Sequence, residues 1–406
     1  MARLPLEGIR IVDFGWILAV PHATAWLGVM GAEVIKVESA QRLDLVRLLG
    51  HMPGRAVDVN GSPYFNGINY GKRGVTLNMQ NPKARALARE LVRRSDAVTE
   101  NFTVGNMEKW GLGYRDLCAV KPDIIMLSGT PLGQFGRESA CVGWGPHTQA
   151  YAGMCHLTGY AGGPPSGLGG TWPDFMIGVV MAYVLLGALH YRRRTGRGQH
   201  IDLAMAEVVM SMIPEGLMEY TMNGRERGRM GNRDDIMAPH NVYRCRGEDK
   251  WVALAVGSEE EWRALCRASG HPEWSVDPRF ADARARKRNE DVLDPLIASW
   301  TRERDAVDIM HALQRVGVAA TPVYNTAGLC CDPQFVERGY TVPIDHPVTG
   351  PVRAGGLPCL YSGIDKNDMR YTAAPCVGQH NEAVFGDLLG LSAGEIASLR
   401  DDKVLF

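Results

Sequence analysis

Asp174 stands where a carboxylate could do covalent chemistry. It follows a segment rich in glycine and proline, residues 158–170, and it lies at the predicted start of a helix that continues to about Arg194. The free amides at the start of a helix favour an ionised side chain by typically about 0.3–1 kcal/mol. An ionised carboxylate beside a loop that lets a substrate approach closely is a candidate nucleophile toward a thioester. Aspartate is also a favoured helix cap, so position alone leaves a purely structural role open.

Basic residues near the predicted N-terminal strands form a second group that could do chemistry. Lys72 and Arg73 lie in the segment 71–74, and Lys109 lies in the segment 100–113. Lysine, arginine and backbone amides at strand ends are the groups that a phosphorylated ligand requires. A single surface lysine is usually only solvated, so the group indicates an anionic ligand without identifying it.

The sequence lacks the motifs of several common enzyme classes. No G-x-G-x-x-G follows the first predicted strand, and there is no Walker-type lysine loop, HExxH or GxSxG. The 11 histidines form no ligand cluster and the 9 cysteines no CxxC pair, so we predict no metal site and reduced thiols in a cytoplasmic protein. The 44 basic and 45 acidic side chains nearly cancel, which favours small-molecule substrates over nucleic acid or an anionic membrane as partners.

One apolar run could be mistaken for a membrane span. Residues 175–190 carry no charged side chain and are followed by Arg192, Arg193 and Arg194. The run is shorter than the roughly 20 residues that a span needs, and it lies between polar segments. We therefore predict a buried core helix and no membrane contact. The N-terminal residues show no signal-peptide pattern, so we expect no export.

Alternating strand and helix patterns position these residues. The runs 9–13 and 32–38 are rich in β-branched residues, and the segment 21–30 between them has helical spacing. An amphipathic helix over 82–94 and two short strands, 96–100 and 123–128, continue the series. This order predicts a doubly wound, Rossmann-like α/β sheet with ligand sites at the carboxyl ends of its strands.

A smaller unit is predicted in the second half of the chain. A strand over 251–256 and amphipathic helices over 259–268 and 291–315 indicate an α+β domain. We predict a large domain from residues 1–210 and 326–406, a linker over 211–235 and a small domain over 236–325.

Several collinear motifs resemble the class III coenzyme A (CoA) transferases, of the formyl-CoA transferase and carnitine CoA-transferase type. They are LPLEGIR, GAEVIKVE, ENFTVGNMEKWGLGY, RTGRGQHID and GQHNEAVFGDLLGLSAGEIASLR, over residues 4–10, 31–38, 100–114, 194–202 and 378–400. The resemblance implies an interlocked dimer of subunits, each with a large domain built from both chain ends and a small inserted domain.

The resemblance also implies a mechanism. The family nucleophile is an aspartate that precedes a helix, and the motif over 194–202 places Asp174 on that position. Asp174 would form a mixed anhydride with the acyl group of the donor and then a thioester with CoA. CoA would be a substrate, and no tightly bound cofactor is implied. Backbone amides of the glycine-rich loop would be the natural oxyanion donors.

The CoA contacts carry over from the resemblance with two departures. In relatives the position of Lys109 is often arginine, and lysine keeps the charge without the bidentate fork. Residues 130–132 (Thr-Pro-Leu) replace a lysine and a tyrosine of some relatives, so the acyl pocket is expected to differ. The implied CoA-binding residues are Ile17, Leu18, Asn69, Lys72, Arg73, Asn101, Phe102, Thr103 and Lys109.

Two alternatives stay open on the sequence. An α-methylacyl-CoA racemase would pair a histidine with the aspartate, but Trp144 occupies that histidine's position and His147 lies three residues away. A CoA-binding subunit that works beside a related catalytic chain is the second alternative, so the chain is expected as a homodimer or a hetero-oligomer. The acceptor is predicted to be an aromatic or dicarboxylic acid, as in transferases that act on benzylsuccinate.

Overall fold

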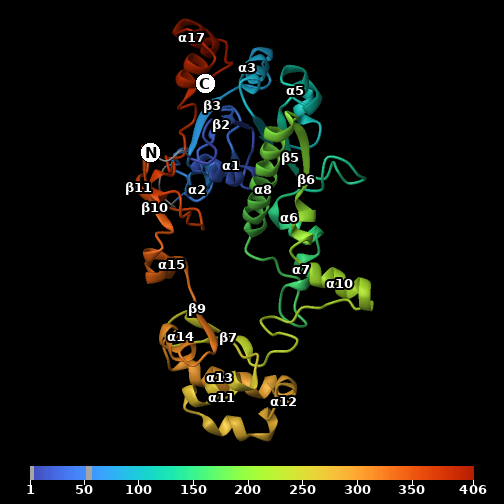
Figure 1. Cartoon of the computed structure of the whole chain (residues 1–406), viewed down its shortest axis with the longest axis vertical. Helices are drawn as coiled ribbons and strands as arrows, with labels where there is room; N and C mark the ends of the chain where they lie inside the picture. The colour runs from blue at the N-terminus through green and yellow to red at the C-terminus, as the bar shows by residue number, and fades with distance from the viewer. Residues whose placement is uncertain (1–3, 52–56) are drawn as a thin grey trace. The chain divides into compact units, whose positions relative to one another are not determined.

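The computed structural model describes residues 4–51 and 57–406 (Figure 1). The chain divides into two compact units. Unit 1 contains Met1–Cys155, Gly167–Arg225 and Tyr340–Phe406, and unit 2 contains His156–Ser166 and Glu226–Gly339. The segment 211–235, predicted as a linker, includes a helix of unit 1 and continues into unit 2 from Glu226 on.

Unit 1 is built on a six-stranded parallel sheet with the order β3-β2-β1-β4-β5-β6. The chain starts in the middle of the sheet, extends it through β2 and β3, and then extends it in the other direction from β1. Doubly wound sheets bind ligands at this reversal, outside the carboxyl ends of the strands. The predicted fold class is confirmed. The strands are β1 (Arg10–Asp13), β2 (Glu33–Glu38), β3 (Lys72–Thr76), β4 (Ala97–Glu100), β5 (Ile125–Thr130) and β6 (Gln199–Ala204).

Helices cover both faces of the sheet. On one face α1 (Ala19–Val29) and α8 (Trp172–Thr195) pack side by side over apolar residues of β1 and β5 (Figure 1). On the other face α3 (Pro82–Arg93) and α17 (Ala393–Asp401) help to enclose a second core. The other helices of unit 1 are α2 (Pro63–Asn69), α4 (Asn106–Lys109), α5 (Tyr114–Val120), α6 (Gly145–Tyr151), α7 (Met154–Leu157, which extends into unit 2), α9 (Met205–Met210) and α10 (Pro214–Asn223), with a 3₁₀ turn over Leu45–Leu48.

Helix α8 is the apolar helix that the sequence predicts for the core. Its 24 residues have the length and apolar character of a membrane span, and half of its most apolar window is buried. Ile177, Met181 and Leu185 belong to the core with α1 and the sheet. Gly196, with φ of +70°, ends the helix in the left-handed conformation that glycine adopts readily. The packing of this buried stripe is that of a core helix.

The C-terminal part of the chain returns to unit 1, as expected for a domain built from both ends. The hairpin of β10 (Thr341–His346) and β11 (Gly350–Gly355) precedes a π-helical segment over Glu382–Leu388. The hydroxyl of Thr76 in β3 donates to the backbone oxygen of Phe406 at 2.8 Å. The end of the chain is thus attached to an edge strand of the sheet.

Unit 2 is a three-stranded antiparallel sheet with the order β7-β8-β9 and helices on one face. Its α+β class agrees with the prediction. The helix expected over 291–315 is instead two helices, because Asp305 accepts the backbone N–H of Val307 at 2.8 Å and caps a new helix. The elements are β7 (His240–Arg244), β8 (Trp251–Ala255), β9 (Ala319–Val323), α11 (Glu259–Ser269), α12 (Ala283–Arg288), α13 (Glu290–Arg302), α14 (Ala306–Gln314), α15 (Thr326–Cys331) and α16 (Pro333–Glu337), with 3₁₀ turns over Pro272–Val276 and Pro278–Phe280.

Candidate active site

Asp174 lies inside the first turn of α8. Thr171 is the residue that precedes the helix, and its carbonyl oxygen accepts the backbone N–H of Asp174 at 3.1 Å. The interpretation of Asp174 as the helix cap is therefore wrong, because Asp174 is the third helical residue. The residue is only 8% exposed. Burial raises the pKa of its carboxyl to about 6, although its own backbone N–H partly opposes the change.

The carboxylate of Asp174 lies against the first residue of α6. A Cβ placed on Gly145 would be 2.0 Å from Oδ2 of Asp174. The next residue of α8, Phe175, contacts the ring of His22 in α1 edge-on, with centroids 5.1 Å apart. Burial and the charge of Lys72 lower the pKa of His22 to about 4, so this imidazole is neutral at physiological pH. Burial, rather than a neighbouring charge, thus accounts for the raised pKa of Asp174.

The glycine-rich segment before α8 has no regular secondary structure, as predicted. Its first part, up to Ser166, belongs to unit 2, and Gly167 to Thr171 belong to unit 1. The backbone N–H of Leu168 donates to Oε1 of Gln149 in α6 at 2.9 Å. This contact fixes the part of the loop that leads into the helix of Asp174.

The loop between β1 and α1 has a strained backbone at the sheet's reversal. Ile17 has φ of +64°, a conformation that β-branched residues avoid. Its N–H donates to both carboxylate oxygens of Asp44, at 3.1 and 3.2 Å. Nζ of Lys36 donates to the backbone oxygen of Gly15 at 2.6 Å and lies 3.4 Å from Asp44. Both charged side chains are fully buried. Neither residue is among the predicted site residues, although a lysine inside an apolar strand is a usable signal in the sequence.

Asn101 at the end of β4 holds the same loop from the other side. Its Oδ1 accepts the N–H of Trp16 at 2.7 Å, and its Nδ2 donates to the carbonyl of Trp16 at 2.8 Å. The ring of Phe102 lies edge-on to Trp16 and to Trp110. The guanidinium of Arg42 lies 5.3 Å from the centroid of the Trp16 ring. Asn101 thus shapes the loop, while Phe102, Trp16 and Arg42 line it.

Lys72 is the predicted site residue whose surroundings differ most from expectation. Its Nζ donates to Oδ2 of Asp13, Oδ1 of Asn69 and the carbonyl of Pro21, at 2.8–2.9 Å. Burial lowers the pKa of Lys72 to about 8, while Asp13 opposes this change. All three N–H donors of the ammonium are used within the protein, so a phosphate contact would require one of these bonds to break. Lys72 and Asn69 are buried and form a hydrogen-bonded network with Asp13 and Pro21.

The remaining predicted CoA contacts lie nearer the surface. Arg73 is half-exposed and pairs with Glu33 at 2.9 Å. Thr103 and Lys109 are exposed, and Lys109 ends the short helix α4. Leu18 is buried at the start of α1. The structure therefore brings Ile17, Asn101 and Phe102 together around one loop, and it separates Lys72 from the solvent.

A second carboxyl with an altered pKa lies at the end of β4. Burial raises the pKa of Glu100 to about 7, although its hydrogen bond to Ser128 and the N–H of Phe102 oppose this. The hydroxyl of Ser128 lies 3.0 Å from Nε2 of His200. Glu100 therefore supports the backbone of the segment that holds Asn101.

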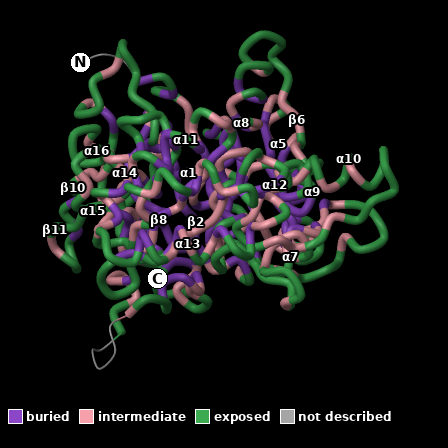
Figure 2. The backbone as a smooth tube through the Cα atoms, turned by 90° about the horizontal axis from the view of Figure 1, so that it is seen from below, coloured by how far each residue is buried: buried purple, intermediate pink, exposed green. Residues whose placement is uncertain are grey.

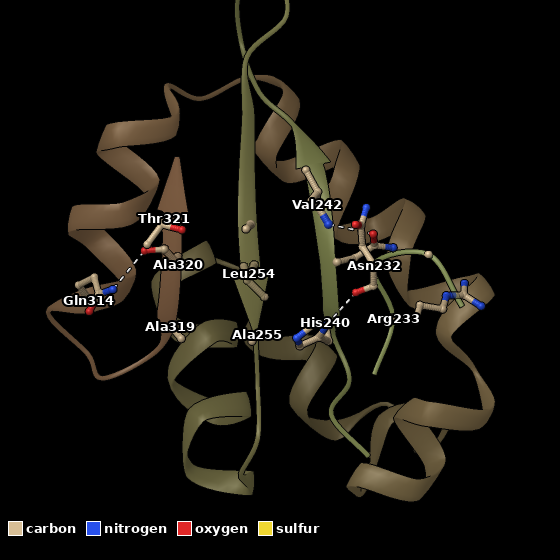
Figure 3. A pocket seen from close by; sticks show the side chains of 13 residues that line it. Asn232, Arg233, His240, Val242, Leu254, Ala255, Gln314, Ala319, Ala320 and Thr321 are labelled. Carbon is tan, nitrogen blue, oxygen red and sulfur yellow. Dashed lines mark hydrogen bonds between the residues drawn. The ribbon is translucent and has the colours of Figure 1, made fainter. Parts of the chain in front are cut away.

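Unit 2 contains a cavity of its own (Figure 3). Its volume is about 470 Å³, and it lies over the face of β7, β8 and β9 that the helices leave open. Within the described ranges 4–51 and 57–406, no group of three or more His, Cys, Asp or Glu side chains is placed to hold a metal ion. The cavity is lined by none of the predicted site residues. Its lining includes Asn232, Arg233, His240, Val242, Ala255, Gln314 and Thr321.

Comparison with known proteins decides the family. The model of CoA-transferase family III matches residues 6–381. The chain belongs to CoA-transferase family III. It is 32% identical to succinyl-CoA–D-citramalate CoA-transferase of Chloroflexus aurantiacus over 99% of this chain and 98% of that protein. It is 29% identical to the beta subunit of succinyl-CoA–L-malate CoA-transferase of the same organism, over 99% and 98%.

A solved structure supports both the family and the fold. The CaiB/BaiF family protein of Brucella suis is 30% identical, with a TM-score of 0.85 over 95% of this chain and 100% of that chain. The resemblance seen in the sequence motifs is thereby confirmed. This family III CoA-transferase moves CoA between an acyl-CoA and a carboxylic acid.

Proposed function

We propose that Asp174 is the covalent nucleophile of this CoA transfer. The observation that carries the proposal is a buried carboxylate in the first turn of α8, with its pKa raised to about 6 by burial. At neutral pH the group is still mostly ionised, and a carboxylate stripped of water is more nucleophilic than a solvated one. Helix amides near Asp174 favour its charge, so the nucleophile is both ionised and poorly hydrated.

The transfer proceeds through two kinds of intermediate on Asp174. The carboxylate attacks the thioester carbon of the donor, the C–S bond breaks, and CoA leaves as a thiolate with a mixed anhydride on Asp174. The thiolate attacks Cγ of Asp174 and releases the donor acid, which leaves an aspartyl-CoA thioester. The acceptor carboxylate then attacks Cγ and displaces the thiolate, which attacks the acceptor acyl carbon and restores Asp174. No net proton or further reactant is consumed.

We propose that CoA binds at the β1–α1 loop. Ile17 and Phe102 offer apolar surface to pantetheine, whereas the predicted contact Leu18 is buried behind this surface. Thr103 and the exposed charges of Arg73 and Lys109 suit the phosphates. Asn69, Lys72 and Asn101 were predicted to contact CoA. Since their polar groups hydrogen-bond within the protein, we propose that they support the β1–α1 loop instead. A preformed loop lowers the ordering cost of binding.

A dicarboxylic acid is the proposed acceptor. D-Citramalate and L-malate, which appear in the names of the two relatives described above, are both 2-hydroxy dicarboxylic acids with a four-carbon backbone, and citramalate carries one additional methyl group. Both names give succinyl-CoA as the donor. Trp144, Tyr151 and Trp172, at α6 and the start of α8, are 51%, 64% and 39% exposed. They are therefore available to a substrate or a partner chain. A screen of succinyl-CoA against dicarboxylic and aromatic acids tests the assignment, and faster transfer to an aromatic acid would contradict it.

A second chain, identical or related, is the proposed partner. Helix α10 has no buried residue (Figure 2) and exposes Leu217, Met218, Tyr220 and Met222. Exposed apolar groups of this kind mark protein interfaces. One relative is named as a subunit, which favours testing for a hetero-oligomer as well as the interlocked homodimer. Light scattering on the pure chain, with exchange assays in parallel, distinguishes a monomer, an active homodimer and a chain that needs a partner.

Hydroxylamine trapping tests the nucleophile directly. Hydroxylamine added during turnover with succinyl-CoA should convert Asp174 to a hydroxamate, because both intermediates carry an activated acyl group on Cγ. Peptide mass spectrometry locates the modification, and Asp174→Asn is the control. A hydroxamate on another residue, or none during active exchange, would contradict the proposal.

A further inference from the structure

Helix α6 meets the start of α8 through two residues one turn apart. Gly145 is the first residue of α6 and Gln149 the fifth, so both lie on one face of the helix. A Cβ on Gly145 would lie 2.0 Å from Oδ2 and 3.0 Å from Cγ of Asp174. Oε1 of Gln149 accepts the N–H of Leu168 at 2.9 Å, in the loop that leads into α8. One helix therefore contacts both the carboxylate and the loop.

Backbone conformation does not explain the glycine at position 145. Gly145 is absent from the residues with positive φ, and it is a helical residue that alanine would occupy more favourably. The contact that excludes a larger residue is the carboxylate itself, since all three atoms nearest to the added Cβ belong to Asp174. The missing side chain is thus matched to the position of this carboxylate.

We propose that Gly145 and Gln149 are positioning residues that seat Asp174 for attack. The proposal rests on the assignment of Asp174 as the nucleophile. Gly145 lets Oδ2 lie directly against α6, and Oδ1, which is 3.5 Å from the same added Cβ, is the oxygen turned away from the helix. Gln149 holds the backbone just before α8. Because both contacts come from one short helix, the nucleophile and the loop keep a fixed mutual position.

Gly145→Ala tests whether the contact with Gly145 positions the Asp174 carboxylate. The added methyl group should rotate the Asp174 carboxylate away from α6, and displacements of about 1 Å in an active site can cost about 100-fold in rate. We expect kcat with succinyl-CoA and citramalate to fall by about 100-fold while KM for succinyl-CoA changes less than about threefold. The acid limb of the rate profile should move to lower pH, because a displaced carboxylate is better solvated.

Asp174→Ala provides a readout that does not depend on activity. In that background Gly145→Ala meets no carboxylate, so it should leave the thermal midpoint unchanged or raise it, whereas alone it should lower the midpoint by several degrees. Gly394→Ala is the matched control, because Gly394 lies in the first turn of α17 with nothing within 4 Å of an added Cβ. If Gly145→Ala alone folds poorly, Asp174→Ala should restore folding.

Gln149→Leu tests the second contact. It removes the acceptor of Leu168, and kcat should fall about tenfold with KM for succinyl-CoA retained. The positioning role would be refuted if the changes in thermal midpoint caused by Gly145→Ala and Asp174→Ala simply added in the double variant. Near-normal kcat in Gly145→Ala together with such additivity would refute it as well. Strong coupling with normal kcat in Gly145→Ala would overturn the positioning role, whereas exchange retained in Asp174→Ala would overturn the role of Asp174 as nucleophile, so the two failures are distinguishable.

Discussion

Replacement of Asp174 by asparagine should make the protein more stable at neutral pH while it abolishes exchange. The folded-state pKa of about 6 lies above the ordinary 3.8, because burial disfavours the charge. The folded protein therefore binds more protons than the unfolded chain between these values. The contribution of Asp174 to stability is present in full below pH 3.8 and is lost as the pH rises through 6.

The magnitude follows from the size of this change in pKa. At 1.36 kcal/mol per pH unit, ionised Asp174 lowers the free energy of unfolding by about 3 kcal/mol at pH 7.5. Asparagine has the same shape and no charge to bury, but it gives up about 0.3–1 kcal/mol of helix-dipole interaction. The net gain is about 2 kcal/mol, which corresponds to a rise of about 2 °C in the thermal midpoint of a chain of 406 residues.

The assay compares thermal midpoints of the two proteins between pH 4 and pH 8. The gain of Asp174→Asn should be largest above pH 7 and should disappear toward pH 4, where Asp174 is neutral. Asp116→Asn is the matched control, since Asp116 is the third residue of α5 and is exposed. This control should lose a little stability. A gain for Asp174→Asn that is absent at pH 7.5, or that is the same at every pH, would refute the reasoning.

Three further predictions concern the rate profile and the CoA site. The kcat/KM of exchange should fall tenfold per pH unit below about pH 6, and the Glu100→Gln variant should show the same fall. If the fall is absent in Glu100→Gln, it belongs to Glu100, whose pKa is raised to about 7. Asn101→Ala frees the backbone of Trp16, so KM for acyl-CoA should rise about tenfold in initial-rate assays; an unchanged KM would remove the loop from CoA binding. Lys109→Ala should weaken CoA binding by calorimetry several-fold at low salt and less at high salt, whereas Lys109→Arg should not; a loss that is independent of salt would contradict a phosphate contact.

Local patterns predicted the elements of unit 1 better than its contacts. Periodicity located β1, α1 and α8 closely, because each has a mostly apolar stretch at its centre. The strand that carries Lys72 was not predicted, since its residues, KRGVT, begin with two charges. The ammonium is neutralised by Asp13, which is 59 positions away in sequence. A contact at that separation leaves no local signal.

Only the part of the candidate site that has a local sequence signal could be predicted. Asp174 could be selected because a glycine-rich loop, a proline and a long helix surround it in sequence. Its true position, the third residue of the helix, depends on where Thr171 leaves the helical conformation. The contact between Gly145 and the Asp174 carboxylate depends on the packing of α6 against α8. The residue spacing within either helix cannot predict that packing.

In the proposed site, the strained conformation of Ile17 belongs to the part that binds CoA and not to the part that selects the acid. Its strain is held by Asp44, Lys36 and Asn101, which are buried or half-buried and belong to the fold itself. The cost of this backbone shape is therefore met during folding, in the absence of any substrate. If the proposed acyl pocket at residues 130–132 and the exposed aromatic side chains is correct, substitutions there would change the acid that the enzyme accepts and leave CoA binding unchanged. One rigid carrier site combined with a variable acid site is a simple route by which a single scaffold diversifies.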